Sequence, residues 1–389
     1  MASRLSIKTL ALTGALAAAG MAQAQIEVPM APDVPLPIAG EEASVHFGGR
    51  FLGSIFGSGF EALDFDERIV QARAIVRADL PYNLQFDVAV DFQSRFVDPE
   101  RLFFTWQGPV NVFVGHYRPQ VTIEERTSRA NFLFVERTGF SDAADASRQW
   151  GVGVEKVGER FAIEQSVHRS ALADAGTAAH FTAAGRAAYA PFLTEIVNSY
   201  VGFSWRYRRT TQDQDPFSYA ASPGGIATLG PVIETPEVGE ADFLFNGEAF
   251  FAFGPFAIQS EYGLIRPFNP LFVDPPTFRG GYVEVSWSPT GEARDFSLAR
   301  GGGLRPEILR PLNAGGPGAL RLFARYDALD LTDGEVVGGE QDAVSFGASW
   351  RPIDRFRVAL VYAHASFTDL LGSEVPDANS IEALIQVEF

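Results

Sequence analysis

The chain has 389 residues, no cysteine, and 48 acidic against 31 basic residues, which gives a net charge of −17. The lack of cysteine excludes a disulfide framework and any thiolate nucleophile or metal ligand, and so acidic a chain argues against a nucleic-acid partner. The 34 phenylalanines and 38 glycines beside 3 methionines favour a sheet protein with aromatic belts over a helical bundle.

The first 24 residues have the pattern of a secretory signal peptide. Arg4 and Lys8 give a positive start, an apolar stretch runs from residue 10 to 21, and Ala22-Gln23-Ala24 is typical of a cleavage site. The apolar stretch is shorter than the roughly 20 residues that a spanning helix needs. Cleavage would leave a mature chain that starts at Gln25, with 29 basic and 48 acidic residues and a net charge of −19.

No later window contains 18 uncharged apolar residues in a row. A membrane-embedded form of the chain must therefore be a closed β-barrel, because only helices and closed barrels satisfy every backbone polar group inside hydrocarbon. Residues 25–44 carry four prolines and no periodicity. We expect them to form an extended periplasmic lead-in to a barrel domain that spans residues 45–389.

From Val45 onward, apolar side chains recur at every second position almost everywhere. Val88 and Val90 share one parity, for example, and Asp87 and Asp91 share the other. A charged face opposite a continuous apolar face is typical of a lipid-facing wall around a water-filled lumen. We therefore predict an all-β fold, a transmembrane antiparallel barrel. Its sixteen strands are expected near residues 45–55, 68–80, 84–92, 101–107, 110–117, 149–157, 161–169, 179–190, 196–208, 242–253, 256–266, 279–287, 318–328, 341–350, 355–365 and 379–389.

The connections between these strands differ in length on the two sides of the barrel. If both termini are periplasmic, the periplasmic turns are mostly short, as at 81–83 and 254–255, whereas the outer loops include the long segments 118–148 and 209–241. The connection 288–317 breaks this rule, because it is long and lies on the side of the short turns. We expect it either to fold as a periplasmic plug or rim, or to contain two further short strands.

The third outer loop combines apolar residues such as Ile123, Phe132 and Phe134 with several charges. A loop this long and this apolar is expected to fold inward against the barrel wall and to narrow the lumen. The alternative is a surface loop with a few buried anchors.

Motifs in and after this loop are similar to those of a known family. Gly115-His116-Tyr117-Arg118-Pro119, with Ile123-Glu124-Glu125 and Glu136-Arg137, resembles the corresponding loop of the phosphate-selective porin O/P family of Gram-negative bacteria. The segments 281–283, 290–294 and 318–331 resemble further family segments, and the likeness runs from about residue 45 to the end. The resemblance implies a sixteen-stranded, homotrimeric anion porin in the bacterial outer membrane. The chain departs from the family at Arg321, which stands in place of a glutamate, and in having Lys156 as its only lysine after the signal.

The resemblance also implies the partners of the protein. These are small anions, with phosphate the candidate, and the lipid and lipopolysaccharide of the outer membrane. In the last strand, Ile381, Ile385 and Phe389 share one face, and the terminal aromatic residue resembles the signal that barrel-insertion machinery reads. We expect export through the periplasm, and no cofactor or nucleic acid.

Arginines are the candidate site residues, because planar guanidinium groups suit the recognition of anions. Across the wall, these arginines either present successive anion sites to the lumen or pair with acids such as Asp87, Asp91, Glu248 and Glu261. The predicted constriction comprises Arg118, Arg126, Arg129 and Arg137 of the third loop, with Arg73 and Arg77 on the facing wall. Further lumen arginines are predicted at Arg50, Arg206, Arg208, Arg321, Arg325, Arg355 and Arg357.

The sequence offers little for an enzyme. Its five histidines lack metal-clamping spacings, and no Gly-x-Ser-x-Gly motif occurs. Loop acids such as Asp213 and Asp330 are more typical of solvated loops than of calcium sites. We expect no catalytic or metal-binding residues, and passive diffusion of small anions as the function. The alternatives are a weakly selective general porin and a non-conducting structural or binding barrel.

Overall fold

The computed structural model describes residues 34–38, 41–60, 62–92, 98–169, 180–210, 216–222, 226, 229–268, 274–368 and 376–389. The predicted signal peptide, 1–24, lies outside these residues. Within the described ranges, no helix is long and apolar enough to cross a membrane.

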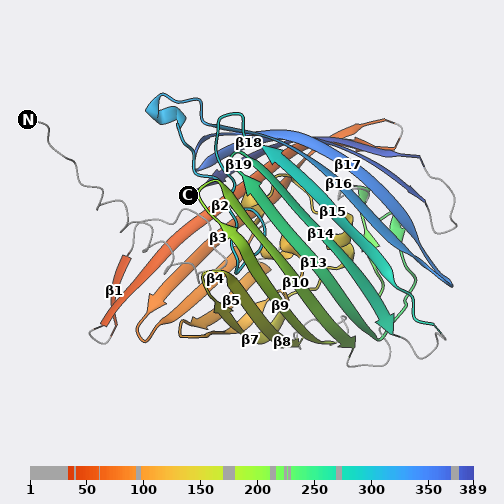
Figure 1. Ribbon diagram of the computed structural model, residues 1–389, viewed down its shortest axis with the longest axis horizontal. Helices are drawn as coiled ribbons and strands as arrows, with labels where there is room; N and C mark the ends of the chain where they lie inside the picture. The colour runs from red at the N-terminus through yellow and green to blue at the C-terminus, as the bar shows by residue number, and fades with distance from the viewer. Residues whose placement is uncertain are drawn as a thin grey trace, which may run out of the picture.

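Sixteen antiparallel strands form one closed barrel (Figure 1). Strands β2 to β10 each pair with the next strand in sequence, β10 pairs with β13, and β19 pairs with β2, which closes the cylinder. The predicted all-β barrel and its strand number are therefore confirmed. The barrel strands are β2 (Glu41–Gly59), β3 (Asp64–Leu80), β4 (Leu84–Asp91), β5 (Asp98–Trp106), β6 (Asn111–Tyr117), β7 (Gln149–Val157), β8 (Phe161–Arg169), β9 (His180–Leu193), β10 (Val197–Thr210), β13 (Ala241–Phe253), β14 (Phe256–Phe268), β15 (Phe278–Trp287), β16 (Ala319–Asp333), β17 (Val336–Ile353), β18 (Phe356–Thr368) and β19 (Ala378–Glu388).

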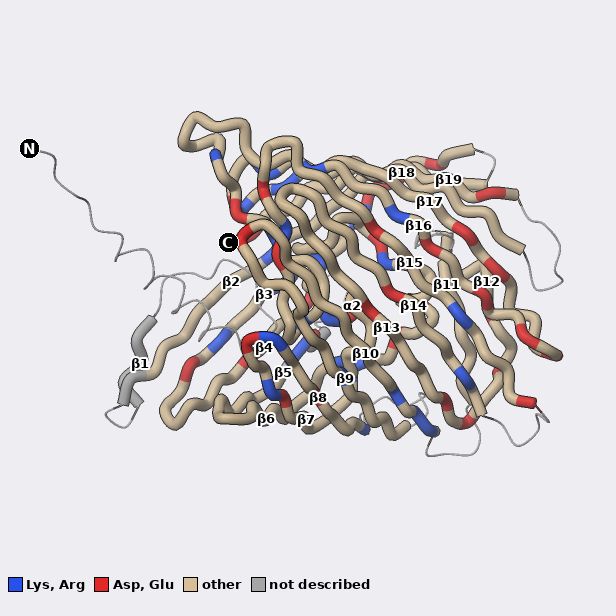
Figure 2. The backbone as a smooth tube through the Cα atoms, in the orientation of Figure 1, with Lys and Arg blue, Asp and Glu red and all other residues tan. Residues whose placement is uncertain are grey.

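The outer wall of the barrel is apolar, and polar side chains point inward. Figure 2 marks the basic and acidic residues along the strands. On β13, Phe245 and Phe251 are each 44 % exposed, whereas Asn246 and Glu248 are 1 % and 4 % exposed. This alternation follows from the two-residue period of a strand, which sends successive side chains to opposite faces. The exposed apolar wall is the surface that lipid covers in an outer-membrane barrel.

The first strands depart from the prediction. Strand β2 begins at Glu41, and the preceding residues 34–38 form β1 (Val34–Ile38), which pairs with β2, so part of the expected lead-in is strand. Between β2 and β3, Leu52 pairs with Gln71 and Gly53 pairs with Ile69, which leaves Val70 as the extra residue of a bulge. The bulge turns Val70 inward, where it is 5 % exposed, although its parity in the sequence predicted a lipid-facing position.

The third loop, residues 118–148, lies against the inner wall. It contains the short helices α2 (Ile123–Arg126) and α3 (Gly139–Ala143) and the 3-10 turn η1 (Arg129–Asn131), and Figure 1 shows these helical turns behind the front wall of strands. Phe134 packs edge-on against Phe323 of β16, with 4.9 Å between ring centroids. Apolar burial holds the loop in the lumen.

A second outer segment also covers the inner wall. Its described residues, 216–222, 226 and 229–240, contain β11 (Ala220–Ala221) and β12 (Ile233–Glu234), which pair with each other. Tyr219 and Ile233 of this segment belong to one buried apolar cluster with Leu244 of β13 and Phe278 of β15, and Phe140 of the third loop joins the same cluster. The lumen beside these strands is therefore filled by a hydrophobic core.

Residues 288–318, which we call the plug segment, enter the barrel from the end with the short turns. The segment contains no barrel strand, only an isolated bridge between Phe296 and Gly303 and the 3-10 turn η4 (Leu312–Ala314). Of the two predicted alternatives, the plug is therefore correct. Gly302 has a φ of +72°, and a Cβ there would lie 2.5 Å from Ile123 Cγ2, so glycine permits the plug segment to pass close to the third loop.

Candidate functional site

Arginines of the inner wall anchor the third loop on one side of the lumen. Arg357 donates to the backbone oxygens of Phe132 and Leu133, at 2.6 and 2.7 Å. Arg351 donates to that of Ala130 at 3.0 Å. Arg325 donates to the backbone oxygen of Glu136 and to the carboxylate of Glu124, each at 3.2 Å. We call this region, along β10 and β13 to β19, the filled side, because loops and the plug segment occupy the space in front of these strands.

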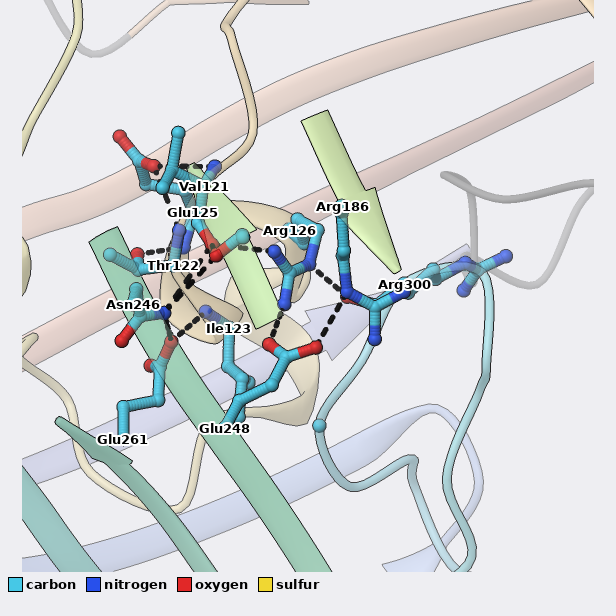
Figure 3. A network of polar contacts seen from close by, with 12 residues as sticks. Val121, Thr122, Ile123, Glu125, Arg126, Arg186, Asn246, Glu248, Glu261 and Arg300 are labelled. Atoms are coloured by element: carbon cyan, nitrogen blue, oxygen red, sulfur yellow. Dashed lines mark hydrogen bonds and ion pairs between the residues drawn. The ribbon is translucent and has the colours of Figure 1, made fainter. Parts of the chain in front are cut away.

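A buried ionic network joins the third loop, the wall and the plug segment (Figure 3). The carboxylate of Glu248 on β13 accepts hydrogen bonds from Arg126 of α2 and from Arg186 of β9. Arg126 also donates from Nε to the backbone oxygen of Arg300 in the plug segment, at 2.7 Å. Burial alone would lower the pKa of Arg126, but Glu248 and Glu261 outweigh it and raise this pKa. Arg126 is thus a charged structural anchor.

Helix α2 is also stabilised by a cap at its own N-terminus. Thr122 and Glu125 form a capping box, and the Ile123 backbone N–H donates to the Glu261 carboxylate at 2.6 Å. These bonds orient the start of the loop, so that the residues after α2 face the opposite wall.

A cavity of about 200 Å³ lies between the third loop and strands β3 to β6. We call this cavity the basic chamber and the region along β3 to β8 the open side. The chamber is lined by arginines from both walls and by fewer acids. The arginines are Arg73, Arg101, Arg118, Arg126, Arg129, Arg137 and Arg148, and the acids are Asp91, Glu100 and Glu125.

Acids compensate these arginines only in part. Arg73 lies 2.9 Å from Glu100 and 3.6 Å from Asp91, and Glu100 also binds Arg148. Arg118 and Arg137 share a single carboxylate, that of Asp145. Two cations on one anion leave a local excess of positive charge on the open side.

Arg129 is the chamber arginine that no acid neutralises directly. It is half-buried, and its guanidinium group has no hydrogen-bond or ion-pair partner among the residues that the structure describes. Burial lowers the pKa of Arg129, and Glu136 opposes this effect, yet a guanidinium group stays protonated in proteins. Its five N–H donors are therefore available to a ligand in the chamber.

The predicted constriction residues divide between two places. Arg73, Arg118, Arg129 and Arg137 line the basic chamber, and Arg126 lines it with a guanidinium that is wholly buried against Glu248. Arg77 lies outside the chamber, in a smaller cavity, where it binds Asp87 at 3.2 Å.

The further predicted lumen arginines are used for structure. Arg50 donates to Gln71, and Arg321 donates to the Ser288 hydroxyl of the plug segment. Arg206 and Arg208 share the carboxylate of Asp242. Together with Arg325 and Arg357, described above, these side chains point inward but contact the wall, the loops or the plug segment.

The prediction for Arg355 is wrong. Strand β17 continues to Ile353 and β18 begins at Phe356, so residues 354–355 form the turn and Arg355 is exposed there. Its parity matches that of Arg357, but parity places a side chain only within a strand.

Two chamber arginines were missed by the sequence prediction. Arg101 shares the parity of the inward residue Phe103 on β5, which is the signal that would have found it. Arg148 precedes β7 by one residue, and its role depends on the fold of the loop.

Both the family model and a curated relative of this chain describe porins. The family model described as phosphate-selective porin O and P matches residues 63–389. A Caulobacter vibrioides protein described as uncharacterized is 29 % identical over 304 residues, 73 % of this chain and 59 % of that protein, so the chain spans about three fifths of this relative. Porin O of Pseudomonas aeruginosa is 23 % identical over 357 residues, 79 % of this chain and 78 % of that protein.

Solved porin structures share the fold. An anion-selective porin from Comamonas acidovorans has a TM-score of 0.57 at 12 % identity, covering 90 % of this chain and 100 % of that one. OmpT of Vibrio cholerae, in a trimer form, has a TM-score of 0.56 at 12 % identity, covering 89 % and 99 %. Likeness at this identity shows the barrel fold alone. The barrel and the family match together place the protein in the outer membrane of a Gram-negative bacterium, and the chain belongs to the phosphate-selective porin O and P family.

Proposed function

We propose that the protein is a passive channel for small anions, with inorganic phosphate as the leading candidate substrate. The observation that carries this proposal is Arg129, a half-buried guanidinium without a protein partner among the described residues, in a chamber with seven arginines and three acids. A charged donor in a confined space of low dielectric attracts anions more strongly than one in bulk water. The family membership of the chain supports the same function.

The shared carboxylates favour transit over tight trapping. An anion in the basic chamber competes with Asp145 for Arg118 and Arg137, and with Glu100 for Arg73 and Arg148. Each guanidinium then replaces part of the hydration shell of the anion without holding it permanently, which conduction requires. No proton transfer or covalent step is needed.

Phosphate fits these donors better than chloride does. A tetrahedral oxyanion accepts parallel hydrogen bonds from a planar guanidinium, and several such groups line one chamber. Lysine plays no part inside, because Lys156 is exposed and donates to the backbone oxygen of Pro109 near a turn. Selection would rest on arginine geometry.

The remaining features of the proposal concern topology and assembly. The end of the barrel with long loops faces the exterior of the cell, and the end with short turns faces the periplasm. Residues 1–24 act as the export signal, and three copies assemble into a homotrimer. A native mass of one chain in detergent would contradict the trimer.

Planar-bilayer measurement of the purified, full mature chain tests the function. In a KCl gradient, the zero-current potential should have the sign of anion selectivity, and millimolar inorganic phosphate should reduce the chloride current by occupying the chamber. Chloride selectivity without block by phosphate would leave a general anion porin. A cation-selective potential, or no current steps at all, would overturn the proposal, and the second result would favour the non-conducting barrel.

A further inference from the structure

A second cavity of about 50 Å³ lies on the open side, nearer the short turns than the basic chamber. We call it the acidic chamber. Its charged lining residues are Arg77 on β3, Asp87 on β4, Glu155 on β7 and Glu164 on β8. Strand β4 begins and strand β7 ends at a short turn. Asp87 lies three residues after the first residue of β4, and Glu155 lies two residues before the last residue of β7. The chamber is therefore close to the end of the barrel that has the short turns.

Two glutamates carry the net charge of this chamber. Arg77 and Asp87 form an ion pair at 3.2 Å, which leaves Glu155 and Glu164. The Glu155 carboxylate accepts one hydrogen bond, from Asn111 at 3.4 Å, and the Glu164 carboxylate has no hydrogen-bond or ion-pair partner among the described residues. The two stand directly opposite each other in the register of β7 and β8. Like charges in this position destabilise a sheet, so the stability of the fold does not account for this pair.

The two chambers share a wall. Tyr117 and Gln120 line both of them. The Tyr117 ring is held by contacts with Phe113 and His168, at 5.4 and 4.7 Å between ring centroids. Its buried hydroxyl has no partner in the described part of the chain, so it can donate to a species that passes between the chambers.

We infer that Glu155 and Glu164 make the channel conduct asymmetrically, so that anions move more readily from the loop end to the turn end than in the reverse direction. This inference rests on the proposed anion passage. It assigns to the two glutamates a role in the direction of flow, whereas the arginines determine which ions enter.

The asymmetry follows from the order of the fixed charges. An anion that comes from the loop end first meets the basic chamber, which concentrates it, and then leaves past the glutamates toward the periplasm. An anion from the turn end must first pass the glutamates, which repel it. Cations are attracted at the turn end by the glutamates and repelled at the loop end by the arginines. A positive periplasmic compartment therefore drives anions and cations into the pore, each from the end that attracts it. The effect should weaken in concentrated salt, because the screening length falls from about 10 Å at 0.1 M to about 3 Å at 1 M.

The test is the current–voltage relation of the full mature channel in symmetric KCl. At 0.1 M salt, the current at a fixed voltage should be roughly two- to fourfold larger when the periplasmic compartment is positive. The paired substitution Glu155→Gln and Glu164→Gln should reduce this ratio to about 1. The orientation of each channel is assigned with Arg355→Cys, because the chain has no cysteine of its own and Arg355 lies in an exposed turn at the turn end.

Glu159→Gln is the matched control, since Glu159 is exposed in the turn that joins the same two strands. It should leave the current ratio unchanged. An anion-selective channel with a symmetric relation, or one whose asymmetry survives the paired substitution, would overturn this inference alone. Cation selectivity or the absence of current would overturn the proposed function and this inference with it.

Discussion

The filled side and the open side of the lumen use the same residue type in different ways. On the filled side, Arg357 and Arg351 point inward from the wall and donate to backbone oxygens of the third loop. On the open side, Arg129 of that same loop faces a cavity and has no partner among the described residues. An arginine of the lumen is therefore an anchor where a loop carbonyl covers it and an anion site where a cavity remains.

This difference shows that lumen charge cannot be counted from parity alone. Arg126 and Arg129 are three positions apart in one loop, yet the first is neutralised by Glu248 and the second is not. The comparison predicts that substitutions on the filled side change stability, whereas substitutions on the open side change selectivity.

The largest effect is expected for Glu248→Ala on the filled side. This change leaves the buried guanidinium groups of Arg126 and Arg186 without their shared acid, and breaking a buried ion pair in this way costs roughly 3–5 kcal/mol. Chemical denaturation in detergent should show the loss, and the released loop and plug segment should make the single-channel current larger and noisier. The control is Glu195→Ala in an exposed turn. Equal stability of the two variants would contradict the anchoring role.

Arg357→Ala should be the next largest change. It removes the charged donor of two hydrogen bonds to loop carbonyls, and a hydrogen bond to a charged group is worth about 1.5–3 kcal/mol. The neutral carbonyls that remain cost less than the two buried cations that Glu248→Ala leaves without an acid. We expect a lower denaturation midpoint with little change in the zero-current potential. A shift of this potential toward cation selectivity at unchanged stability would show that the filled side contributes to the anion path.

Arg129→Ala should have the opposite signature. Because the Arg129 side chain has no protein partner to lose, the free energy of unfolding of the variant should stay within about 0.5 kcal/mol of the wild type. The anion-to-cation permeability ratio should fall several-fold, and block by phosphate should weaken. Arg355→Ala, which removes an equal charge from an exposed turn, should change neither property. An Arg129 variant indistinguishable from this control would remove the central observation behind the proposed function.

The smallest expected effect concerns Asp142 of α3. Burial raises the pKa of Asp142 to about 7, with Arg137 opposing and Glu136 adding to the shift. Because the folded-state pKa is raised, the stabilisation is fully present below the unfolded value, near 4, and is lost as the pH rises through 7. The denaturation midpoint should therefore fall more between pH 5 and pH 8 in the wild type than in Asp142→Asn. Parallel pH profiles would contradict this assignment.

The sequence was sufficient for the barrel because alternation is a local property. Val88 and Val90 against Asp87 and Asp91 identify the two faces of β4 without any tertiary information. The same rule fails at Val70, where a bulge reverses the parity, and at Arg355, where the strand begins one residue later than predicted. Bulges and strand ends depend on neighbouring strands, which a single sequence does not show.

The site was less predictable, because contacts between distant segments determine which arginines face the chamber and which are paired with acids. Charge and length pointed to the third loop, and Arg118, Arg129 and Arg137 do line the basic chamber. Nothing local distinguishes Arg126 as the anchor of Glu248. The path of the plug segment likewise depends on contacts between distant residues, such as that of Gly302 with Ile123. The only sign of this contact in the sequence is the run of glycines at 301–303.

The narrow part of the lumen is held together by residues that are far apart in the chain. Arg126 and Glu248 are separated by 122 positions, Glu124 and Arg325 by 201, and Phe132 and Arg357 by 225. Contacts over such separations form late, because closing the intervening chain costs entropy before the contacts repay it. We therefore expect the third loop to reach its final position only after β13 to β18 have joined the cylinder. On this expectation a freshly inserted barrel is wider inside than the finished one, and a copy arrested at that stage would leave the outer membrane more permeable than the mature channel does.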